Sequence, residues 1–385
     1  MSEHPFDRVT LEDLRRRRSA KWALYPADVL PAWVAEMDYP LADPIRAALH
    51  AAVDRGDCGY ATKGDLGRAF AGWAAKHWAW SIGPDDVHLV CDVVTGIAEI
   101  LRVATAPGDG VVIEPPVYPP FAGTVRALGR RVIEAPLARA GGRWSPDLGA
   151  IEAAYRAGAR AHLVCSPQNP TGIVYPRETL AAIAELAARH DVLVLSDEIH
   201  APLTLPGAAH VPFPSVSDAA RERAIVLTSA SKSWNVAGLK AAMMIASGER
   251  PREVLAKLPP ETPYHAGHLG VLAAQVAFTE GDPWLAETHA ILDRNRTLLA
   301  ELLAAHVPRV AYVPPQAGYL AWLDFGAVPD AGDDPARALR DRGRLAVSPG
   351  PTFGAQGKGF ARLNLGTTRA LLEEAVARIA ATFPA

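Results

Sequence analysis

Three polar side chains stand shortly after apolar, strand-like runs of the sequence. They are Asn169, Asp197 and Lys232, and Lys232 is flanked by Ser229 and Ser231. Ligands of open parallel sheets bind beyond the carboxyl ends of the strands, so side chains at these positions meet at one edge of a sheet. We therefore expect an amide, a carboxylate and an amine to converge on a single site.

The combination of these groups favours one kind of cofactor. A lysine amine can form an imine, the neighbouring serines can bind a phosphate, and a buried aspartate can pair with a protonated ring nitrogen. Pyridoxal 5'-phosphate needs an amine that forms an imine, groups that bind its phosphate and a carboxylate that pairs with its ring nitrogen. No G-x-x-x-x-G-K-[ST] loop and no G-x-G-x-x-G after a strand occurs in the sequence, so nucleotide cofactors lack their usual binding loops.

The elements that position these residues follow an alternating pattern. Short apolar runs predict strands at residues 111–114, 162–165, 192–196 and 224–227, and the last three start about 30 residues apart, the length of a βαβ unit. Between two of them, Leu180, Ile183, Ala184 and Ala187 have helical spacing, and Pro176 suits the first turn of that helix. The pattern predicts an α/β fold with a mostly parallel sheet.

The last third of the chain has a different pattern. A long helix is expected over residues 283–306, followed by strands at 319–325 and 361–365, a Gly/Pro-rich loop at 348–359 and a closing helix from Arg369. These elements predict a smaller α+β domain after a large α/β domain.

Composition excludes several classes of protein. The 385 residues carry a formal net charge of −3, which argues against a nucleic-acid partner. The first nine residues are polar, and every stretch of about 18 residues is interrupted by a charge or a proline. We therefore expect no secretory signal and no membrane span, and we expect the protein to be cytoplasmic. Cys58, Cys91 and Cys165 lack Cys-x-x-Cys spacing and are interpreted as reduced core thiols.

Two further features have no function assigned. The basic run 15–18 is typical of a solvated helix face. His265 and His268 lack a matching set of carboxylate or cysteine ligands, so no metal site is expected and they are interpreted as structural or pocket-lining.

Seven sequence blocks distributed along the chain resemble one family. The blocks are Lys21-Trp22, residues 33–40 (WVAEMDYP), 115–121 (PPVYPPF), 169–172 (NPTG), 196–200 (SDEIH), 229–232 (SASK) with Lys240, and 362–364 (RLN). With these blocks the chain is similar to fold-type I pyridoxal-phosphate enzymes of the aminotransferase class I/II superfamily, and among them to the cystathionine β-lyase (MalY/PatB-type) C–S lyases.

The resemblance implies a fold and a domain division. A large cofactor-binding domain with a mostly parallel seven-stranded sheet is expected over residues 46–280. Residues 1–45 and 281–385 are expected to form the smaller domain.

The resemblance also implies roles around the cofactor ring. Lys232 would hold the cofactor and then remove the substrate α-proton, and Asp197 would pair with the ring nitrogen. Asn169 would donate to the phenolic oxygen, and Tyr118 would stack on the ring. His200 would lie next to the ring, although an ordinary packing role remains an alternative.

The phosphate would be bound by hydroxyl groups, a cation and backbone N–H groups at a helix start. These are Ser229, Ser231, Lys240, Val93 and Val94. The family turn Pro-Gly-Val-Val-Pro-Gly here has Asp92 in place of glycine and Thr95 in place of proline. An aspartate beside a phosphate repels it, so the geometry of this segment is open.

The substrate and the partner subunit complete the expectation. Arg362 would bind the substrate α-carboxylate, with Asn169 beside it, and the backbone at Ala35 would contact the same side. Tyr60 would reach the phosphate of a neighbouring subunit, which implies a homodimer with shared active sites.

The expected reaction is β-elimination from cystathionine or a related S-substituted L-cysteine, giving a thiol, pyruvate and ammonia. Lys232, Tyr60 and Tyr118 are the candidates for protonating the leaving sulfur. An aminotransferase on the same fold is the alternative, and a regulatory dimer of this fold is a third hypothesis. The physiological thioether is not indicated by the sequence.

Overall fold

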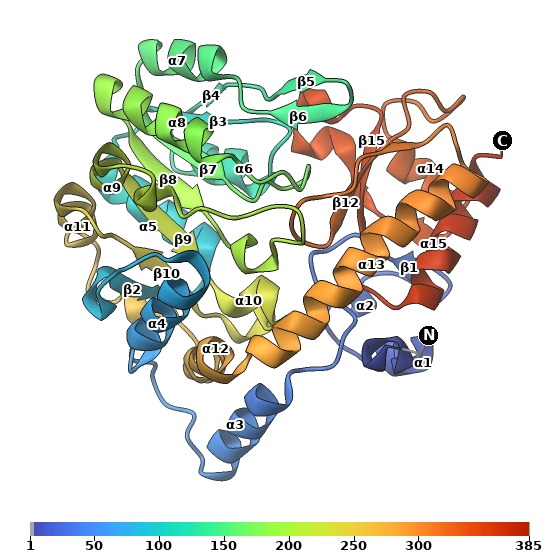
Figure 1. Cartoon of the computed structure of the whole chain (residues 1–385), viewed down its shortest axis with the longest axis horizontal. Helices are drawn as coiled ribbons and strands as arrows, with labels where there is room; N and C mark the ends of the chain where they lie inside the picture. The colour runs from blue at the N-terminus through green and yellow to red at the C-terminus, as the bar shows by residue number, and fades with distance from the viewer. Residues whose placement is uncertain (1–3, 385) are drawn as a thin grey trace.

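A seven-stranded sheet forms the centre of the computed structural model, which describes residues 4–384 (Figure 1). Only β10 runs antiparallel to its neighbours within this sheet; the five strands from β9 to β4 are all parallel. The predicted α/β fold is confirmed. In spatial order the strands are β2 (Val87–Val90), β10 (Ala242–Ile245), β9 (Ala224–Thr228), β8 (Leu193–Asp197), β7 (Ala159–Cys165), β3 (Gly110–Ile113) and β4 (Arg131–Glu134).

Helices cover both faces of this sheet because successive strand residues point to opposite sides. In β7, Leu163 belongs to the apolar cluster with α5 (Val93–Ala104), α6 (Pro120–Ala127) and α11 (Glu249–Leu255). Its neighbour Val164 belongs to the cluster with α7 (Leu148–Arg156), α8 (Arg177–His190) and α9 (Asp218–Arg223). Every predicted strand of the sheet is therefore a buried strand with two apolar faces.

Helix α8 confirms the predicted apolar stripe, with one correction. Leu180, Ile183, Ala184 and Ala187 are all buried against the sheet. Pro176, however, is the N-cap residue with an extended backbone, and the first turn begins at Arg177. Proline has no N–H to contribute and its fixed φ also suits the position just before a helix.

The C-terminal part forms a second, smaller sheet next to the long helix α13 (Asp282–His306) (Figure 1). Helices α14 (Pro335–Asp341) and α15 (Arg369–Thr382) belong to the same part, and the predicted loop at 348–359 contains the short strand β14. The order is β11 (Ala311–Tyr312), β12 (Leu320–Asp324), β15 (Phe360–Asn364) and β14 (Ser348–Pro349).

The N-terminal segment joins this C-terminal part. Strand β1 (Leu30–Pro31) pairs in parallel with β13 (Leu345–Ala346), and Figure 1 shows α1 (Leu11–Arg15) and α2 (Ala20–Ala23) at the same end of the molecule as α15. This pairing agrees with the expected grouping of residues 1–45 with 281–385, while the domain bounds themselves stay a prediction.

The remaining elements lie outside the main sheet. Helix α12 contacts α3, α4 and α10, and β5 and β6 form a hairpin that lies against the C-terminal sheet, where Arg139 pairs with Asp324. Their bounds are α3 (Asp43–Asp54), α4 (Leu66–Trp78), α10 (Ala230–Ser233), α12 (His268–Glu280), β5 (Ala138–Ala140) and β6 (Arg143–Ser145).

Two interpretations of the sequence are corrected. Only Cys165 is a buried thiol; Cys91 is half-buried just after β2, and Cys58 is exposed in a loop, because neither lies inside a strand. Arg17 is not simply solvated. Its guanidinium donates to the carbonyl oxygens of Met37, Asp38 and Tyr39 at 3.1–3.3 Å.

The sequence also predicts that the chain has no membrane span and no metal site, and the described residues 4–384 bear on both predictions. No helix between residues 4 and 384 has the length and apolar character needed to span a membrane. The described chain likewise contains no cluster of three or more His, Cys, Asp or Glu side chains arranged to hold a metal ion. Residues 1–3 of the polar N-terminal stretch lie outside the described residues.

Candidate active site

A cavity of about 690 Å³ lies at the carboxyl ends of the parallel strands and reaches the C-terminal sheet. The tertiary structure brings together on its wall every predicted site residue except Ser229 and Tyr60. These residues are Ala35, Val93, Val94, Tyr118, Asn169, Asp197, His200, Ser231, Lys232, Lys240 and Arg362.

Lys232 lies in α10, the short helix that follows β9. Its Nζ donates to the carbonyl oxygen of Ala35 at 3.0 Å. Burial lowers the pKa of Lys232 to about 8, and the positive charge of Arg362 acts in the same direction. A buried amine with a lowered pKa is available as a nucleophile and as a base.

Asp197 is the last residue of β8 and is 5% exposed. Burial raises the pKa of its carboxyl group to about 7, while the N–H of Ile199, which donates to Oδ1 at 3.1 Å, opposes the rise. A buried carboxylate whose charge is only partly compensated stabilises a cation placed next to it. A protonated ring nitrogen in the cavity would be such a cation.

Arg362 lies in the middle of β15 with its guanidinium buried. Nη1 donates to Asn169 Oδ1 at 2.8 Å, and Nη2 donates to the Trp33 carbonyl at 2.9 Å and to Ser348 Oγ at 3.0 Å. Its Nε is buried without a partner. Burial lowers the pKa of Arg362 to about 10, so the group remains cationic at neutral pH and can bind an anion.

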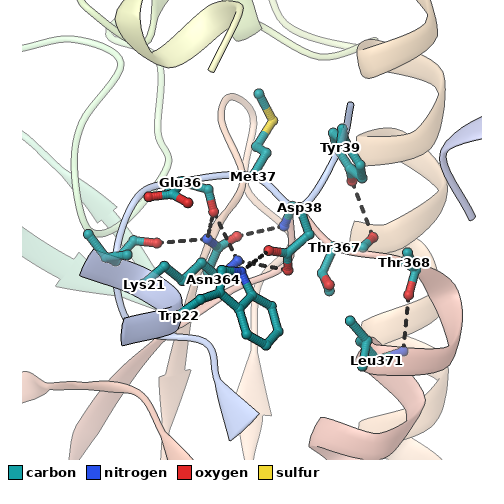
Figure 2. Close-up of polar contacts among 12 residues, drawn as sticks. Lys21, Trp22, Glu36, Met37, Asp38, Tyr39, Asn364, Thr367, Thr368 and Leu371 are labelled. Carbon is teal, nitrogen blue, oxygen red and sulfur yellow. Dashed lines mark hydrogen bonds and ion pairs between the residues drawn. The ribbon is translucent and has the colours of Figure 1, made fainter. Parts of the chain in front are cut away.

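Buried side chains from distant parts of the chain hold the backbone of residues 33–38 in place by hydrogen bonds. Asn364 Nδ2 donates to the carbonyls of Val34 at 2.7 Å and Glu36 at 2.6 Å. Lys21 Nζ donates to the Glu36 carbonyl at 3.0 Å and to Asp38 at 2.8 Å. Figure 2 shows Lys21, Trp22 and Asn364 gathered around this segment, which presents the Ala35 carbonyl to Lys232.

Residues 92–95, where the sequence departs from the family turn, form the N-terminus of α5. Asp92 is its N-cap residue, with Oδ1 accepting from the N–H of Thr95 at 2.8 Å and Oδ2 accepting from Lys240 Nζ at 2.9 Å. Val93 and Val94 follow on the cavity wall. The aspartate therefore replaces the family glycine without disrupting the helix start.

Ser229 and Tyr60 are not brought to the cavity within one chain. The Ser229 hydroxyl donates to the Ala241 carbonyl at 2.6 Å and contacts Ser231 Oγ at 2.7 Å, so it supports Ser231. Tyr60 is 86% exposed, with its ring edge-on to Tyr264. An exposed tyrosine away from the cavity can act there only across a subunit contact.

Two aromatic residues have the environments expected of groups next to a ring. Tyr118 lines the cavity, and burial raises its pKa, so it stays protonated. Burial lowers the pKa of His200 to about 3, with Lys232 and Arg362 adding to the effect, and its Nδ1 is buried without a partner. His200 is therefore a neutral imidazole at physiological pH.

Three further side chains, which the sequence did not indicate, organise the site. Ser348 pairs with Arg362 because β14 and β15 are in register at these two residues. Asn235 exchanges hydrogen bonds of 2.8 Å with the N–H and the carbonyl of Met37. Tyr319 donates to the Ala35 carbonyl at 3.1 Å. Asn235 lies three residues after Lys232 and was within reach of motif reasoning, whereas Ser348 and Tyr319 have no local signal.

The residues fit pyridoxal 5'-phosphate. The orphaned Nδ1 of His200, the buried Asp197 and the amine of Lys232 surround one cavity, and the start of α5 with Ser231 and Lys240 lies on the same wall. Helix N-termini with nearby hydroxyl and ammonium groups bind phosphate. The donor set thus matches an aldehyde, a basic ring nitrogen and a phosphate ester.

Comparisons with known proteins agree with this chemistry. The sequence model of the family "Aminotransferase class I and II" matches residues 35–379. A Mycobacterium tuberculosis (strain H37Rv) protein, provisionally named a cystathionine beta-lyase, is 44% identical over 405 residues, covering 98% of each chain. Cystathionine beta-lyase PatB of Bacillus subtilis is 33% identical and covers 92% of each chain.

Among solved structures, one from Corynebacterium diphtheriae, provisionally described as a PLP-dependent beta-cystathionase, has a TM-score of 0.91. It is 36% identical, and the match covers 96% of this chain and 97% of that chain.

Proposed function

Because the chain belongs to the aminotransferase class I and II family, we propose that it is a pyridoxal-phosphate-dependent C–S β-lyase acting on cystathionine or related S-substituted L-cysteines. The observation that carries the proposal is the convergence of Lys232, Asp197 and Arg362 on one cavity. A cationic group for the substrate carboxylate thus lines the same cavity as an amine that can act as a base.

Bound pyridoxal phosphate would supply an aldehyde that condenses with amines and a ring that delocalises the electron pair left at the substrate Cα. Lys232 would hold the cofactor and, once released by the substrate amine, would take the Cα proton. Asp197 would keep the ring nitrogen protonated, Asn169 would donate to the phenolic oxygen, and Tyr118 would cover the ring face. His200, uncharged, would lie beside the ring.

Arg362 would bind the substrate α-carboxylate through its free Nε and through Nη groups released from the Trp33 carbonyl and Ser348. The Ala35 carbonyl would receive the substrate amine or the Lys232 ammonium on the same side. A substrate bound in this way would present its Cα–H bond to Lys232. Orienting a bond in this way contributes to the rate because the entropic cost is met on binding.

The β-elimination breaks the Cα–H and Cβ–S bonds. The Cα proton goes to Lys232, the sulfur leaves as a thiolate that takes a proton from Lys232, Tyr118 or Tyr60, and the remaining enamine adds water to give pyruvate and ammonia. Neutral Tyr118 on the cavity wall satisfies the requirement for a donor that is protonated at neutral pH.

We also propose a homodimer in which Tyr60 contacts the phosphate bound by the partner subunit. Its 86% exposure outside the cavity of its own chain is consistent with this assignment. Ser229, Ser231, Lys240 and the N–H groups of Val93 and Val94 would form the rest of the phosphate site, with Ser229 acting through Ser231. The cytoplasmic location stays a prediction that cell fractionation would test.

The decisive experiment supplies L-cystathionine to the holoenzyme without any keto acid acceptor. Many turnovers to pyruvate, ammonia and a thiol are expected of a lyase, and Lys232→Ala should abolish them. A single stoichiometric burst that leaves the pyridoxamine form would identify an aminotransferase instead. Holoenzyme that reacts with no amino acid thioether would favour the regulatory dimer.

A further inference from the structure

Asp92 already engages Lys240, the cation assigned to the phosphate site, together with a backbone N–H at the same helix start. Its carboxylate accepts hydrogen bonds from the Thr95 N–H at 2.8 Å and from Lys240 Nζ at 2.9 Å. A backbone N–H in the first turn of a helix and a lysine ammonium are the two kinds of donor that bind phosphate most often. The same cavity wall carries Val93, Val94 and Ser231.

The ion pair between Asp92 and Lys240 lies on this cavity wall and is partly open to solvent. The Asp92 side chain is 32% exposed and that of Lys240 58% exposed. Partial burial opposes ionisation of Asp92, yet the Thr95 N–H and Lys240 lower its pKa, so it is an anion at neutral pH. Lys240, the cation assigned to the phosphate site, is therefore already paired with a fixed negative charge.

We propose that Asp92 is a built-in competitor of the cofactor phosphate, so that this chain binds pyridoxal phosphate more weakly than the same chain without the Asp92 charge. The inference rests on the proposed function only in taking pyridoxal phosphate as the cofactor. It concerns how tightly the cofactor is held and is independent of which reaction follows.

The physical basis is a charge balance. A phosphate monoester carries about −1.5 to −2 charges at pH 7. When it binds at the start of α5, Lys240 must serve two anions that repel each other across the site. For unit charges about 6 Å apart in a partly screened site, this repulsion weakens binding by on the order of tenfold.

Asp92→Asn tests the proposal because asparagine is an equally good N-cap residue and its Oδ1 can still accept from Thr95. Holoenzyme is dialysed to equilibrium at graded pyridoxal phosphate concentrations, and bound cofactor is measured after release. The dissociation constant of Asp92→Asn should fall on the order of tenfold. The matched control is Asp147→Asn, which neutralises the N-cap aspartate of α7, outside the cavity lining, and should change nothing.

Binding of pyridoxal distinguishes an effect of Asp92 on the phosphate from a general effect on cofactor binding. Pyridoxal, which lacks the phosphate, should bind wild type and Asp92→Asn equally. Asp92→Ser, a neutral N-cap of another shape, should reproduce the tighter binding of pyridoxal phosphate if the asparagine variant folds poorly. Equal or weaker binding of pyridoxal phosphate to both neutral variants, or an equal gain for pyridoxal, would overturn the proposal. Wild type that binds no pyridoxal phosphate at all would refute the proposed function instead.

Discussion

Lys21 Nζ and Asp38 Oδ2 form an ion pair of 2.8 Å between side chains that are 1% and 2% exposed. Asp38 also accepts from the indole N–H of Trp22 at 2.9 Å (Figure 2). Through the Glu36 carbonyl, Lys21 holds the backbone that presents Ala35 to Lys232. A buried pair at the N-terminal end of the chain thus supports the amine at the centre of the site.

Lys21→Met should destabilise the protein strongly. It leaves the carboxylate of Asp38 buried with only an indole donor, and breaking a buried ion pair from one side costs about 3–5 kcal/mol. Urea unfolding of the holoenzyme measures the loss.

Lys358→Met is the matched control, because Lys358 pairs at 2.9 Å with Asp333 and these two side chains are 62% and 71% exposed. Exposed pairs contribute about 0–1 kcal/mol. A loss of the same size in both variants would show that the Lys21 pair has no special structural role.

Arg362→Lys should raise KM for an S-substituted cysteine by roughly 30-fold or more, with a smaller effect on kcat. A lysine cannot bind the α-carboxylate in two places while it also contacts Asn169. Initial rates of pyruvate formation give both constants. Arg337→Lys, at a side chain that is 78% exposed, should leave both unchanged. An unaltered KM in Arg362→Lys would remove Arg362 from the carboxylate site.

Asp197→Asn should have opposite effects on stability and on catalysis. Folding raises the pKa of Asp197 from 3.8 to about 7, so the folded state binds more protons between these values and stability falls as pH rises through that window. At pH 8 the cofactor-free variant should therefore be more stable than wild type, on the order of 2–4 kcal/mol.

The holoenzyme of Asp197→Asn should instead lose roughly 100-fold or more in kcat, because a neutral amide no longer keeps the ring nitrogen protonated. Urea unfolding of the cofactor-free proteins at pH 4 and pH 8, together with turnover of the holoenzymes, checks both parts. Equal stability of the two cofactor-free proteins at pH 8 would contradict the conclusion that burial destabilises the ionised Asp197 carboxylate.

The reaction of cofactor-free protein with pyridoxal phosphate should accelerate with pH, reach half its maximal rate near pH 8 and level off about one pH unit above that. The neutral amine is the nucleophile, and burial lowers the pKa of Lys232 to about 8 from 10.5. Stopped-flow absorbance records the rate. The control is Nα-acetyl-lysine in solution, whose ε-amine is free and whose reaction rate should keep rising above about pH 9. A protein profile with the same shape would contradict a lowered Lys232 pKa.

Mixed dimers test the shared site. Lys232→Ala and Tyr60→Ala are each expected to be inactive or nearly so as homodimers. If Tyr60 serves the partner's cavity, random reassembly of the two gives one intact site in each mixed dimer, or about a quarter of wild-type activity. Activity that stays at the level of the separate variants would place Tyr60 outside the partner's site.

Local patterns were enough to predict four parallel strands of the sheet and the three strand-end residues, whereas β2, β4 and the antiparallel β10 were not predicted from them. A strand buried on both faces is a continuous apolar run, and the parallel arrangement places Asn169, Asp197 and Lys232 at one edge whatever the details of packing. The helix at α8 and the long helix α13 likewise follow from periodicity, since residues three and four apart share a face.

Packing between distant segments decided the rest of the site. Arg362 is positioned by Ser348, Asn169 and the carbonyl of Trp33, and the first of these contacts depends on the register of β14 and β15. The 3.0 Å contact of Lys232 with the Ala35 carbonyl joins residues 197 positions apart. No periodicity encodes such partners, because they depend on how two surfaces meet after folding.

The turn at Asp92 shows the same division. The family resemblance implies a glycine at this position, and charge alone predicts that the aspartate repels a phosphate. Only the tertiary structure shows that Asp92 caps α5 and pairs with Lys240, which comes 148 positions later in the chain. Residue type therefore determined the chemistry available to this site, and three-dimensional packing determined which groups share it.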